Sequence, residues 1–180
     1  MEFNNILELS SYISDKLKAG STLESLTNII DCYIGDDWKE FQSDNNNYRQ
    51  VAYQDDNIKV MIISWAPDKV SGIHDHPMFG CILKIMQGEI VEDVYYIQAD
   101  VFYHTDSNHL KANDKSFLKG TDGLHHISNC SNKYCYSLHI YSPSDYKPIY
   151  YGIPTSQGVV HENKIFRINH YVNPPSSKGN

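Results

Sequence analysis

The sequence predicts a mainly β fold, an antiparallel sandwich or small barrel that follows a short helical segment. After residue 47 the chain becomes a series of short segments rich in β-branched and aromatic residues, separated by clusters of Gly, Asn, Asp or Pro. No helical pattern of about 10–15 residues lies between these segments, which argues against the parallel sheet of an α/β fold. With 180 residues and 41% hydrophobic content, the chain is expected to bury one core and form one domain.

Residues 1–47 are expected to form helices that pack on the β part of the same domain. Apolar side chains recur there at near-helical spacing, which predicts helices over residues 5–18, 21–33 and 36–42. Ala19-Gly20 supplies a stop for the first helix. Ser21 followed by Glu24 has the spacing of a capping box and predicts the start of the second helix.

The β part is expected to span residues 48–171. Its predicted strands are residues 49–54, 58–65, 81–86, 89–98, 116–119, 125–129, 135–141 and 164–171. The tail 172–180 contains Pro-Pro and small polar residues, and it is expected to be disordered.

The charge and the apolar runs exclude some classes of partner. The formal net charge is −7 and the isoelectric point is near 5.6, whereas a nucleic acid or an anionic membrane demands a basic surface. A small-molecule ligand is therefore expected. Apolar runs such as residues 60–63 are too short to cross a bilayer, and the first residues lack the pattern of a secretory signal, so the cytoplasm is the expected compartment.

The cysteines are expected to be thiols in that compartment. Cys130 and Cys135 have the residue type of zinc ligands, but their spacing is unusual and no second pair accompanies them. A zinc site at these two residues is therefore disfavoured.

His74 and His76 are the most informative residues in the sequence. One residue separates them in a segment that is predicted to be extended, where side chains two apart point to the same face. Both imidazoles can therefore converge on one metal ion. The competing interpretation is a surface pair that binds no metal.

The spacing after this histidine pair resembles the first motif of the cupins. Four residues separate the pair from Cys81, and six more separate Cys81 from Gly88, but the cupin motif has a glutamate ligand where Cys81 stands. His125, followed after three residues by Asn129, is similar to the second cupin motif. The resemblance implies a double-stranded β-helix, or jelly-roll barrel, whose inward-facing residues hold one ligand site.

Three histidines and no carboxylate then remain as candidate ligands. Imidazoles suit iron, copper, nickel and zinc, so the ligand type alone does not name the metal. Three neutral ligands would leave Fe(II) with its full double positive charge, which favours an anionic thiolate substrate whose pKa the metal would lower.

Ser137, His139 and Tyr141 alternate along a predicted strand, so their side chains point to one face and can form a hydrogen-bonded row. Such a row would fix the tautomer of His139 and aim the Tyr141 hydroxyl into the barrel. The alternative is that Tyr141 only fills the core, with its hydroxyl tied to His139.

Across residues 48–171 the chain resembles the cysteine dioxygenases, non-haem iron cupins that oxidise free L-cysteine to cysteine sulfinate. Residues 72–88, 123–125 and 137–143 are the three blocks that carry the resemblance. It implies an enzyme that acts as a monomer on L-cysteine and O2, with one Fe(II) per chain. The iron ligands that the resemblance implies are His74, His76 and His125.

The same resemblance implies roles for further residues. Ser137, His139 and Tyr141 are similar to the family's catalytic Ser-His-Tyr relay, and Tyr141 would also contact the substrate. In vertebrate-type members the tyrosine is joined by a thioether to the cysteine that replaces the cupin glutamate, which here implies a Cys81–Tyr141 crosslink. Ser142-Pro143 matches the position of a cis peptide bond in the family.

Arg49 is placed like the family's carboxylate-binding arginine, and a planar guanidinium can bind a carboxylate through two hydrogen bonds. The alternative for a strand arginine is a solvated position. The predicted function is therefore an Fe(II)-dependent cysteine dioxygenase. Two other functions stay open: a dioxygenase for another small thiol such as 3-mercaptopropionate, and a cupin that binds a metal or ligand without turnover. Arg49 argues against cysteamine as the substrate, because cysteamine has no carboxylate.

Overall fold

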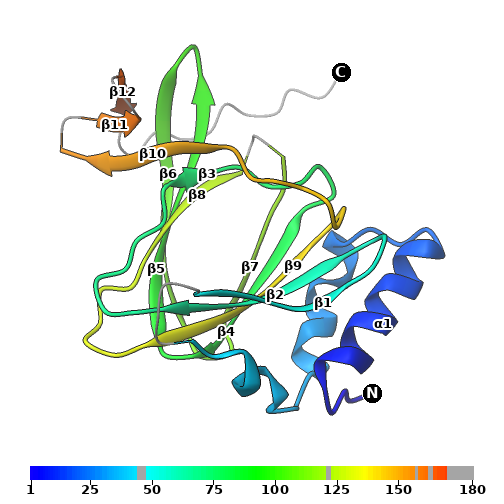
Figure 1. Cartoon of the computed structure of the whole chain (residues 1–180). Coiled ribbons are helices and arrows are strands. Elements are labelled where there is room, and N and C mark those ends of the chain that lie inside the picture. Colours follow the sequence, from blue (N-terminus) through cyan, green and yellow to red (C-terminus); the bar gives the residue numbers. More distant parts are fainter. Residues whose placement is uncertain (44–47, 121–122, 157, 162–163, 170–180) are drawn as a thin grey trace.

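The computed structural model describes residues 1–43, 48–120, 123–156, 158–161 and 164–169 (Figure 1). Its helical elements are α1 (Ile6–Lys18) and two 3-10 helices, η1 (Glu24–Cys32) and η2 (Asp37–Phe41). Its strands are β1 (Arg49–Gln54), β2 (Lys59–Trp65), β3 (Ile73–His74), β4 (Cys81–Gln87), β5 (Glu89–Gln98), β6 (Val101–Lys111), β7 (Lys115–Leu118), β8 (Leu124–Ser128), β9 (Cys135–Tyr141), β10 (Tyr150–Thr155), β11 (Gly158–His161) and β12 (Lys164–Asn169).

The strands form two sheets that together make a barrel. One sheet has the order β1-β2-β9-β4-β7, and the other closes on itself in the order β10-β11-β12-β6-β5-β8-β3. Strands β5 and β9 stand on opposite sides of the barrel in Figure 1. The described pairings are antiparallel except that of β12 with β6, which is parallel. The predicted mainly β barrel is confirmed.

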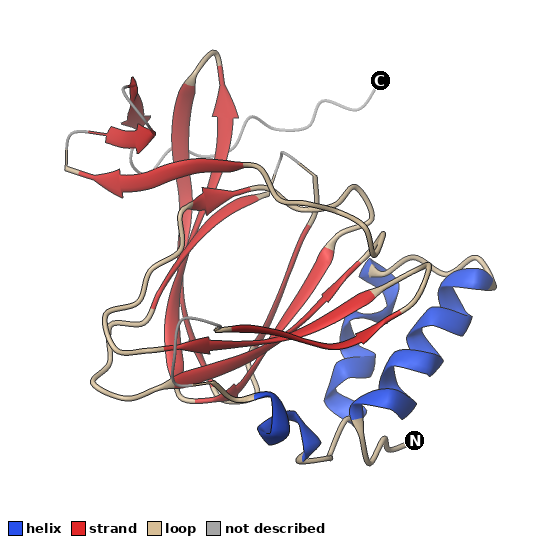
Figure 2. Ribbon diagram, viewed as in Figure 1, coloured by secondary structure: helices blue, strands red, loops and turns tan. Residues whose placement is uncertain are grey.

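Helices α1 and η1 lie side by side outside the five-stranded sheet, and the short η2 lies apart from them at the lower edge of the molecule (Figures 1 and 2). The Asn5 side chain caps α1 by accepting a hydrogen bond from the Glu8 N–H at 2.9 Å. The predicted capping box at Ser21 is wrong: η1 begins at Glu24, and its N-cap residue Leu23 is fully buried and makes no side-chain cap. The polar side chain at this end is that of Thr22, whose hydroxyl oxygen accepts a hydrogen bond from the Ser25 N–H at 3.2 Å.

Strand β9 is buried along its whole length because each of its faces meets a different layer. Tyr136, Leu138 and Ile140 pack in one cluster with the apolar residues of the helices. The alternate residues, which include Ser137 and His139, point to the barrel interior, as strand geometry requires. The same alternation divides β2 and β4 between the two faces.

Three predicted strands match the structure residue for residue, namely 49–54, 89–98 and 135–141. The prediction missed β6, β10 and β11. Strand β6 pairs with β5, and four successive β6 side chains, over residues 106–109, are exposed. No alternation of apolar and polar residues therefore marks this part of β6 as a strand. Residues 170–171 of the last predicted strand and the predicted tail 172–180 lie outside the described residues. No helix among the described residues is long and apolar enough to cross a membrane.

Candidate metal and substrate site

The structure brings together the imidazoles of His74, His76 and His125, although they come from three places in the fold. His74 ends β3, His125 lies on β8, and the Cα atoms of these two residues are paired across the strands. The His125 Nε2 atom lies 3.1 Å from Nε2 of His74 and 3.2 Å from Nε2 of His76. The ligand atoms of all three lie within 4.8 Å of one another, and all three residues are buried.

The convergence of His74 and His76 has a different cause from the one predicted. Strand β3 ends at His74, so His76 is not on the same strand. Instead, the chain after β3 is held on both sides: the Asp75 N–H donates to the Ile149 carbonyl at 3.3 Å and the His76 N–H donates to the Gly120 carbonyl at 3.3 Å. These backbone bonds place the second imidazole beside the first.

The outer nitrogen of each imidazole faces a hydrogen-bond acceptor. Nδ1 of His74 lies 2.9 Å from the Gly72 carbonyl, Nδ1 of His76 lies 2.7 Å from the Gly123 carbonyl, and Nδ1 of His125 lies 2.8 Å from the Glu92 carboxylate. Because an acceptor faces each Nδ1, the ring proton resides there and each Nε2 carries only a lone pair.

Three neutral imidazoles with converging lone pairs make a cation site. Burial, and then the neighbouring His125, lower the pKa of His74 and His76, to about 3 for His76, and burial also lowers that of His125. The Nε2 contacts of 3.1 and 3.2 Å cannot then be hydrogen bonds. They match the spacing of about 3.0 Å between two nitrogens bound at right angles to one metal at about 2.1 Å. The residues present therefore fit a bound divalent metal ion.

Glu92 is a site residue that the sequence analysis missed. It lies on β5, its side chain is 1% exposed, and it accepts hydrogen bonds from His125 and from the Ser116 hydroxyl at 3.0 Å. Burial raises the pKa of Glu92, and the donors Ser116 and Asn108 oppose the shift. A buried carboxylate behind a metal-binding histidine fixes its tautomer and orientation. The contact joins residues 33 apart, so no local spacing reveals it.

Ser137, His139 and Tyr141 form the predicted hydrogen-bonded row. The Ser137 hydroxyl lies 2.8 Å from Nε2 of His139, and the Tyr141 hydroxyl lies 3.3 Å from Nδ1 of His139. The row continues to Trp65, whose indole N–H donates to the Ser137 oxygen at 2.8 Å. This fourth member was not predicted.

Trp65 fixes the direction of one hydrogen bond in this row, because an indole N–H can only donate and the Ser137 oxygen must accept it. With the Ser137 proton directed to Nε2 of His139, Nδ1 of His139 carries the ring proton and donates to the Tyr141 oxygen. The Tyr141 O–H is then left to donate beyond the row. Burial strongly raises the pKa of Tyr141, with the nearby Cys81 adding to the shift, so the hydroxyl keeps its proton.

Cys81 lies directly beside Tyr141. The Cα atoms of the two residues are paired between β4 and β9, and the Cys81 Sγ atom lies 4.0 Å from Nδ1 of His139, the same nitrogen that the Tyr141 hydroxyl faces. The preceding Gly80 has a φ of +102°, and a Cβ there would lie 2.4 Å from the Phe117 ring, so this position requires glycine. Burial raises the pKa of the Cys81 thiol. The Ser142-Pro143 peptide bond that follows β9 is cis.

Arg49 lies in the mouth of the barrel. It lines a cavity of about 330 Å³ together with Tyr141, Tyr150 and five other residues: Lys59, Met61, Tyr146, Lys147 and Pro148. The guanidinium carbon lies 5.0 Å from the centre of the Tyr48 ring and 5.5 Å from that of Tyr150. The predicted cation therefore borders the same cavity as the end of the hydrogen-bonded row.

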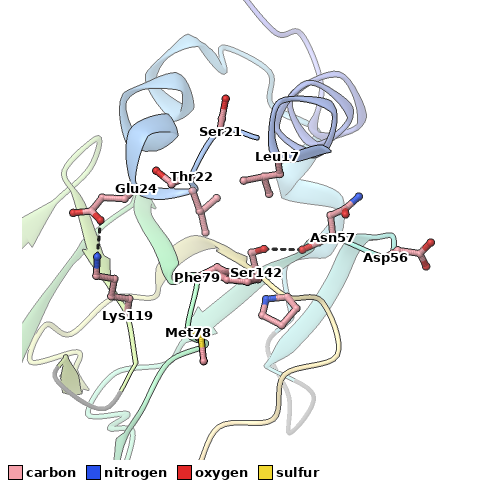
Figure 3. Close-up of a pocket in the computed structure, with 12 residues that line it drawn as sticks. Leu17, Ser21, Thr22, Glu24, Asp56, Asn57, Met78, Phe79, Lys119 and Ser142 are labelled. Carbon is pink, nitrogen blue, oxygen red and sulfur yellow. Dashed lines mark hydrogen bonds and ion pairs between the residues drawn. The ribbon is translucent and has the colours of Figure 1, made fainter. Parts of the chain in front are cut away.

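A second cavity, of about 480 Å³, lies outside the barrel between the helical segment and the β3–β4 turn (Figure 3). Two pairs of its polar groups bind each other: Lys119 pairs with Glu24 at 2.7 Å, and the Ser142 hydroxyl donates to the Asn57 carbonyl at 2.9 Å. None of the predicted site residues line this cavity. Of the predicted site residues, Arg49 and Tyr141 line the smaller cavity.

Solved structures with a similar backbone show the fold. A protein from Bacillus halodurans aligns with a TM-score of 0.53 and 16% identity over 63% of this chain and 83% of its own. A conserved protein with a double-stranded β-helix domain from Klebsiella pneumoniae aligns with a TM-score of 0.51 and 17% identity over 63% of this chain and 87% of its own. The predicted double-stranded β-helix is confirmed.

Sequence comparisons identify the family. The chain is 30% identical over 132 residues to a cysteine dioxygenase type 1 of Danio rerio, and 28% identical over 130 residues to that of Homo sapiens. Each match covers 67% of this chain and 65% of the relative, so the chain spans slightly less than two thirds of those proteins. The family model for cysteine dioxygenase type I matches residues 15–149. The chain therefore belongs to the cysteine dioxygenase type I family.

Proposed function

We propose that this chain is a non-haem, Fe(II)-dependent dioxygenase that adds both atoms of O2 to the sulfur of L-cysteine and releases cysteine sulfinate. The observation that carries the proposal is an arrangement of three kinds of group around one part of the barrel. A cluster of histidines without a carboxylate lies beside a directed row of donors that ends at Tyr141, and Arg49 borders the same cavity. Family membership supports the same reaction.

His74, His76 and His125 would hold one Fe(II) through their Nε2 atoms. A bound Fe(II) would supply the redox chemistry for O2 and would lower the pKa of the substrate thiol. The protein keeps the three imidazoles neutral by burying them, and it keeps their outer nitrogens engaged through two carbonyls and Glu92. No charge from a ligand then opposes binding of an anionic thiolate.

Arg49 would bind the substrate carboxylate, because its fork of N–H donors matches two carboxylate oxygens and its charge faces the cavity. The carboxylate would thereby set the direction in which the thiol enters the barrel. Tyr141 would donate its O–H to the sulfur or to the oxygen atoms that the sulfur acquires. His139 and Ser137 would act through Tyr141, by holding its oxygen as an acceptor and its proton as a donor.

Cys81 and Tyr141 would form a thioether, since they lie directly opposite each other on β4 and β9 and both side chains face Nδ1 of His139. The bond joins sulfur to the ring carbon beside the hydroxyl and removes two hydrogen atoms, which O2 takes up as the oxidant. The crosslink would hold Tyr141 in the orientation that the row sets. Intact mass after exposure to O2 tests it, since the Cys81→Ser variant must show no loss of two hydrogen atoms.

An assay of the metal-loaded chain tests the function. The protein is loaded with Fe(II) without O2, then given O2 and a panel of thiols, and the products are scored by mass for the addition of two oxygen atoms. The expected product is cysteine sulfinate, with both oxygens labelled when isotopic O2 is used. No oxygenated product from any thiol would refute the proposal, and it would favour a metal-binding cupin without turnover.

Two variants test the assigned residues within the same assay. His125→Ala should abolish iron retention, whereas Arg49→Ala should retain iron and mainly raise the KM for cysteine. Product from 3-mercaptopropionate but none from cysteine would overturn the substrate and keep the enzyme class. A His125→Ala protein with normal iron content would show that the ligand set is wrong.

A further inference from the structure

We propose that Tyr150 is a substrate-positioning residue that selects thiols with a carboxylate, by donating its hydroxyl proton to the carboxylate that Arg49 holds. This inference rests on the proposed function and names a specificity determinant for it. Tyr150 begins β10, a strand that the sequence analysis did not predict. Its side chain lies between the candidate metal ligands and the candidate carboxylate site.

The position of Tyr150 is defined by contacts on two sides. Its ring lies 5.2 Å from that of His74 at an angle of 34°, and their Cα atoms are paired between β10 and β3. On the other side, the Arg49 guanidinium lies over the same ring, with its central carbon 5.5 Å from the ring centre. Tyr150 also lines the cavity that Arg49 and Tyr141 border. It therefore touches both ends of the space that a small thiol with a carboxylate would occupy.

The pairing of Tyr150 with Arg49 leaves a donor available. A guanidinium has only N–H donors, so the Tyr150 hydroxyl cannot give its proton to Arg49. The phenol proton is then available for another partner, and no acceptor for it is recorded among the described residues. A carboxylate bound to Arg49 would supply that acceptor beside the hydroxyl. Burial raises the pKa of Tyr150, which keeps the proton on the phenol, although Arg49 opposes the shift.

Asp75 holds the segment that carries Tyr150. Its carboxylate accepts hydrogen bonds from the Tyr146 hydroxyl and, at 2.7 Å, from the Ile149 N–H. The Asp75 N–H donates in turn to the Ile149 carbonyl at 3.3 Å. Asp75, which separates His74 from His76, thus binds both the N–H and the carbonyl of Ile149, the residue before Tyr150. A side chain held in this way is preorganised, which is what a selective contact needs.

The test compares thiols with and without a carboxylate in the metal-loaded chain and its Tyr150→Phe variant. Titration calorimetry without O2 gives the Kd for cysteine, 3-mercaptopropionate and cysteamine, and steady-state rates in O2 give KM and kcat. Loss of one hydrogen bond to a carboxylate should weaken binding of the first two by roughly 10-fold to 100-fold and leave cysteamine within about twofold. Iron content and the melting temperature should match those of the unaltered chain.

Tyr151→Phe is the matched control, because the Tyr151 ring packs against Phe102 at 5.7 Å in a separate apolar cluster. It should change none of the three affinities. Equal weakening of all three thiols by Tyr150→Phe, or loss of iron, would show that Tyr150 only supports His74 and would overturn the inference. Unchanged affinities for both carboxylate thiols would overturn it as well. Failure of the proposed function is distinct, because it is absence of oxygenated product from the unaltered chain, and the anaerobic affinities do not depend on turnover.

Discussion

Replacing Glu92 by Gln should weaken metal binding by about tenfold without unfolding the protein. Glu92 and His125 are both buried, with side chains 1% and 2% exposed, and 2.8 Å separates the carboxylate oxygen from Nδ1. Oε1 accepts from both His125 and Ser116, whereas Oε2 meets only the Asn108 amide at 3.4 Å. A glutamine would therefore keep its oxygen on the His125 side and turn its NH2 toward Asn108, whose amide can turn to offer an oxygen.

The magnitude follows from what this exchange removes. The hydrogen bond to His125 survives, but it changes from one with a charged acceptor, of about 1.5–3 kcal/mol, to a neutral one of about 0.5–1.5 kcal/mol. The difference of roughly 1–1.5 kcal/mol is about a tenfold change in affinity. Glu92→Ala should cost more, up to about 100-fold, because it leaves the Nδ1–H of a metal ligand without a partner.

The assay is competition for Fe(II) with a chelator of known affinity, carried out without O2 and repeated with Zn(II). The matched control is Glu89→Gln, because Glu89 lies on the same strand and also pairs with a histidine, His109, at 3.1 Å, but both side chains are about half exposed. It should bind metal as the unaltered chain does. Affinity of Glu92→Gln within about twofold of the unaltered chain would refute the reasoning that the buried charge supports His125.

Three further predictions concern stability. Gly80→Ala should lower it by about 1–3 kcal/mol or more in urea unfolding, because the new Cβ would lie 2.4 Å from the Phe117 ring at a positive φ. Asn129→Asp should lower the melting temperature more than Asn129→Ala does, because the Asn129 amide N–H groups donate to three carbonyls that an aspartate oxygen would repel. Asp55→Asn should remove part of the pH dependence of unfolding, since burial would raise the pKa of Asp55 but hydrogen bonds from Ser14 and nearby N–H groups leave it lowered. The stability that Asp55 contributes is then present above about pH 4 and lost as pH falls through its lower folded pKa, which urea titrations at several pH values measure.

Controls separate the causes in these cases. Gly20 also has a positive φ, of +93°, but a Cβ there meets nothing within 4 Å, so Gly20→Ala should cost only the backbone strain. Equal losses of unfolding free energy in Gly80→Ala and Gly20→Ala would contradict a clash between the new Cβ at position 80 and the Phe117 ring. Asn129→Asp should recover stability at low pH, where the aspartate is protonated and can donate again. If the free energy of unfolding depends on pH identically in Asp55→Asn and the unaltered chain, protonation of Asp55 is not coupled to unfolding.

Strands in which inward and outward residue types alternate strictly could be predicted from the sequence. The part of the site that such a strand carries was therefore predictable. Alternation in β9 defined its ends and placed Ser137, His139 and Tyr141 on one face before any contact was known. Local patterns failed where backbone contacts from distant segments decide the conformation. The loop that turns His76 beside His74 is held by Gly120 and Ile149, which no spacing near the pair reveals.

Glu92 and Tyr150 were missed for related reasons. Glu92 stands next to Asp93 on β5, and nothing in that sequence distinguishes the carboxylate that points inward from the one that points outward. Tyr150 lies on a strand that contains Gly152 and Pro154, both of which are disfavoured in strands, so the segment was not recognised as one. In both cases the partner lies tens of residues away, and only the closed barrel brings it near.

The double burial of β9 has a consequence for anyone who wishes to alter this protein. Its outward residues Leu138 and Ile140 anchor the helical layer, and the inward residues Ser137 and His139 orient the proton of Tyr141. A substitution that shifts β9 to repack the helices also shifts its inward side chains, because both sets share one backbone. Stability and activity will therefore be hard to select independently along this strand. Directed evolution for thermal tolerance should instead find stabilising substitutions on the exposed face of α1 or among the exposed residues 106–109 of β6.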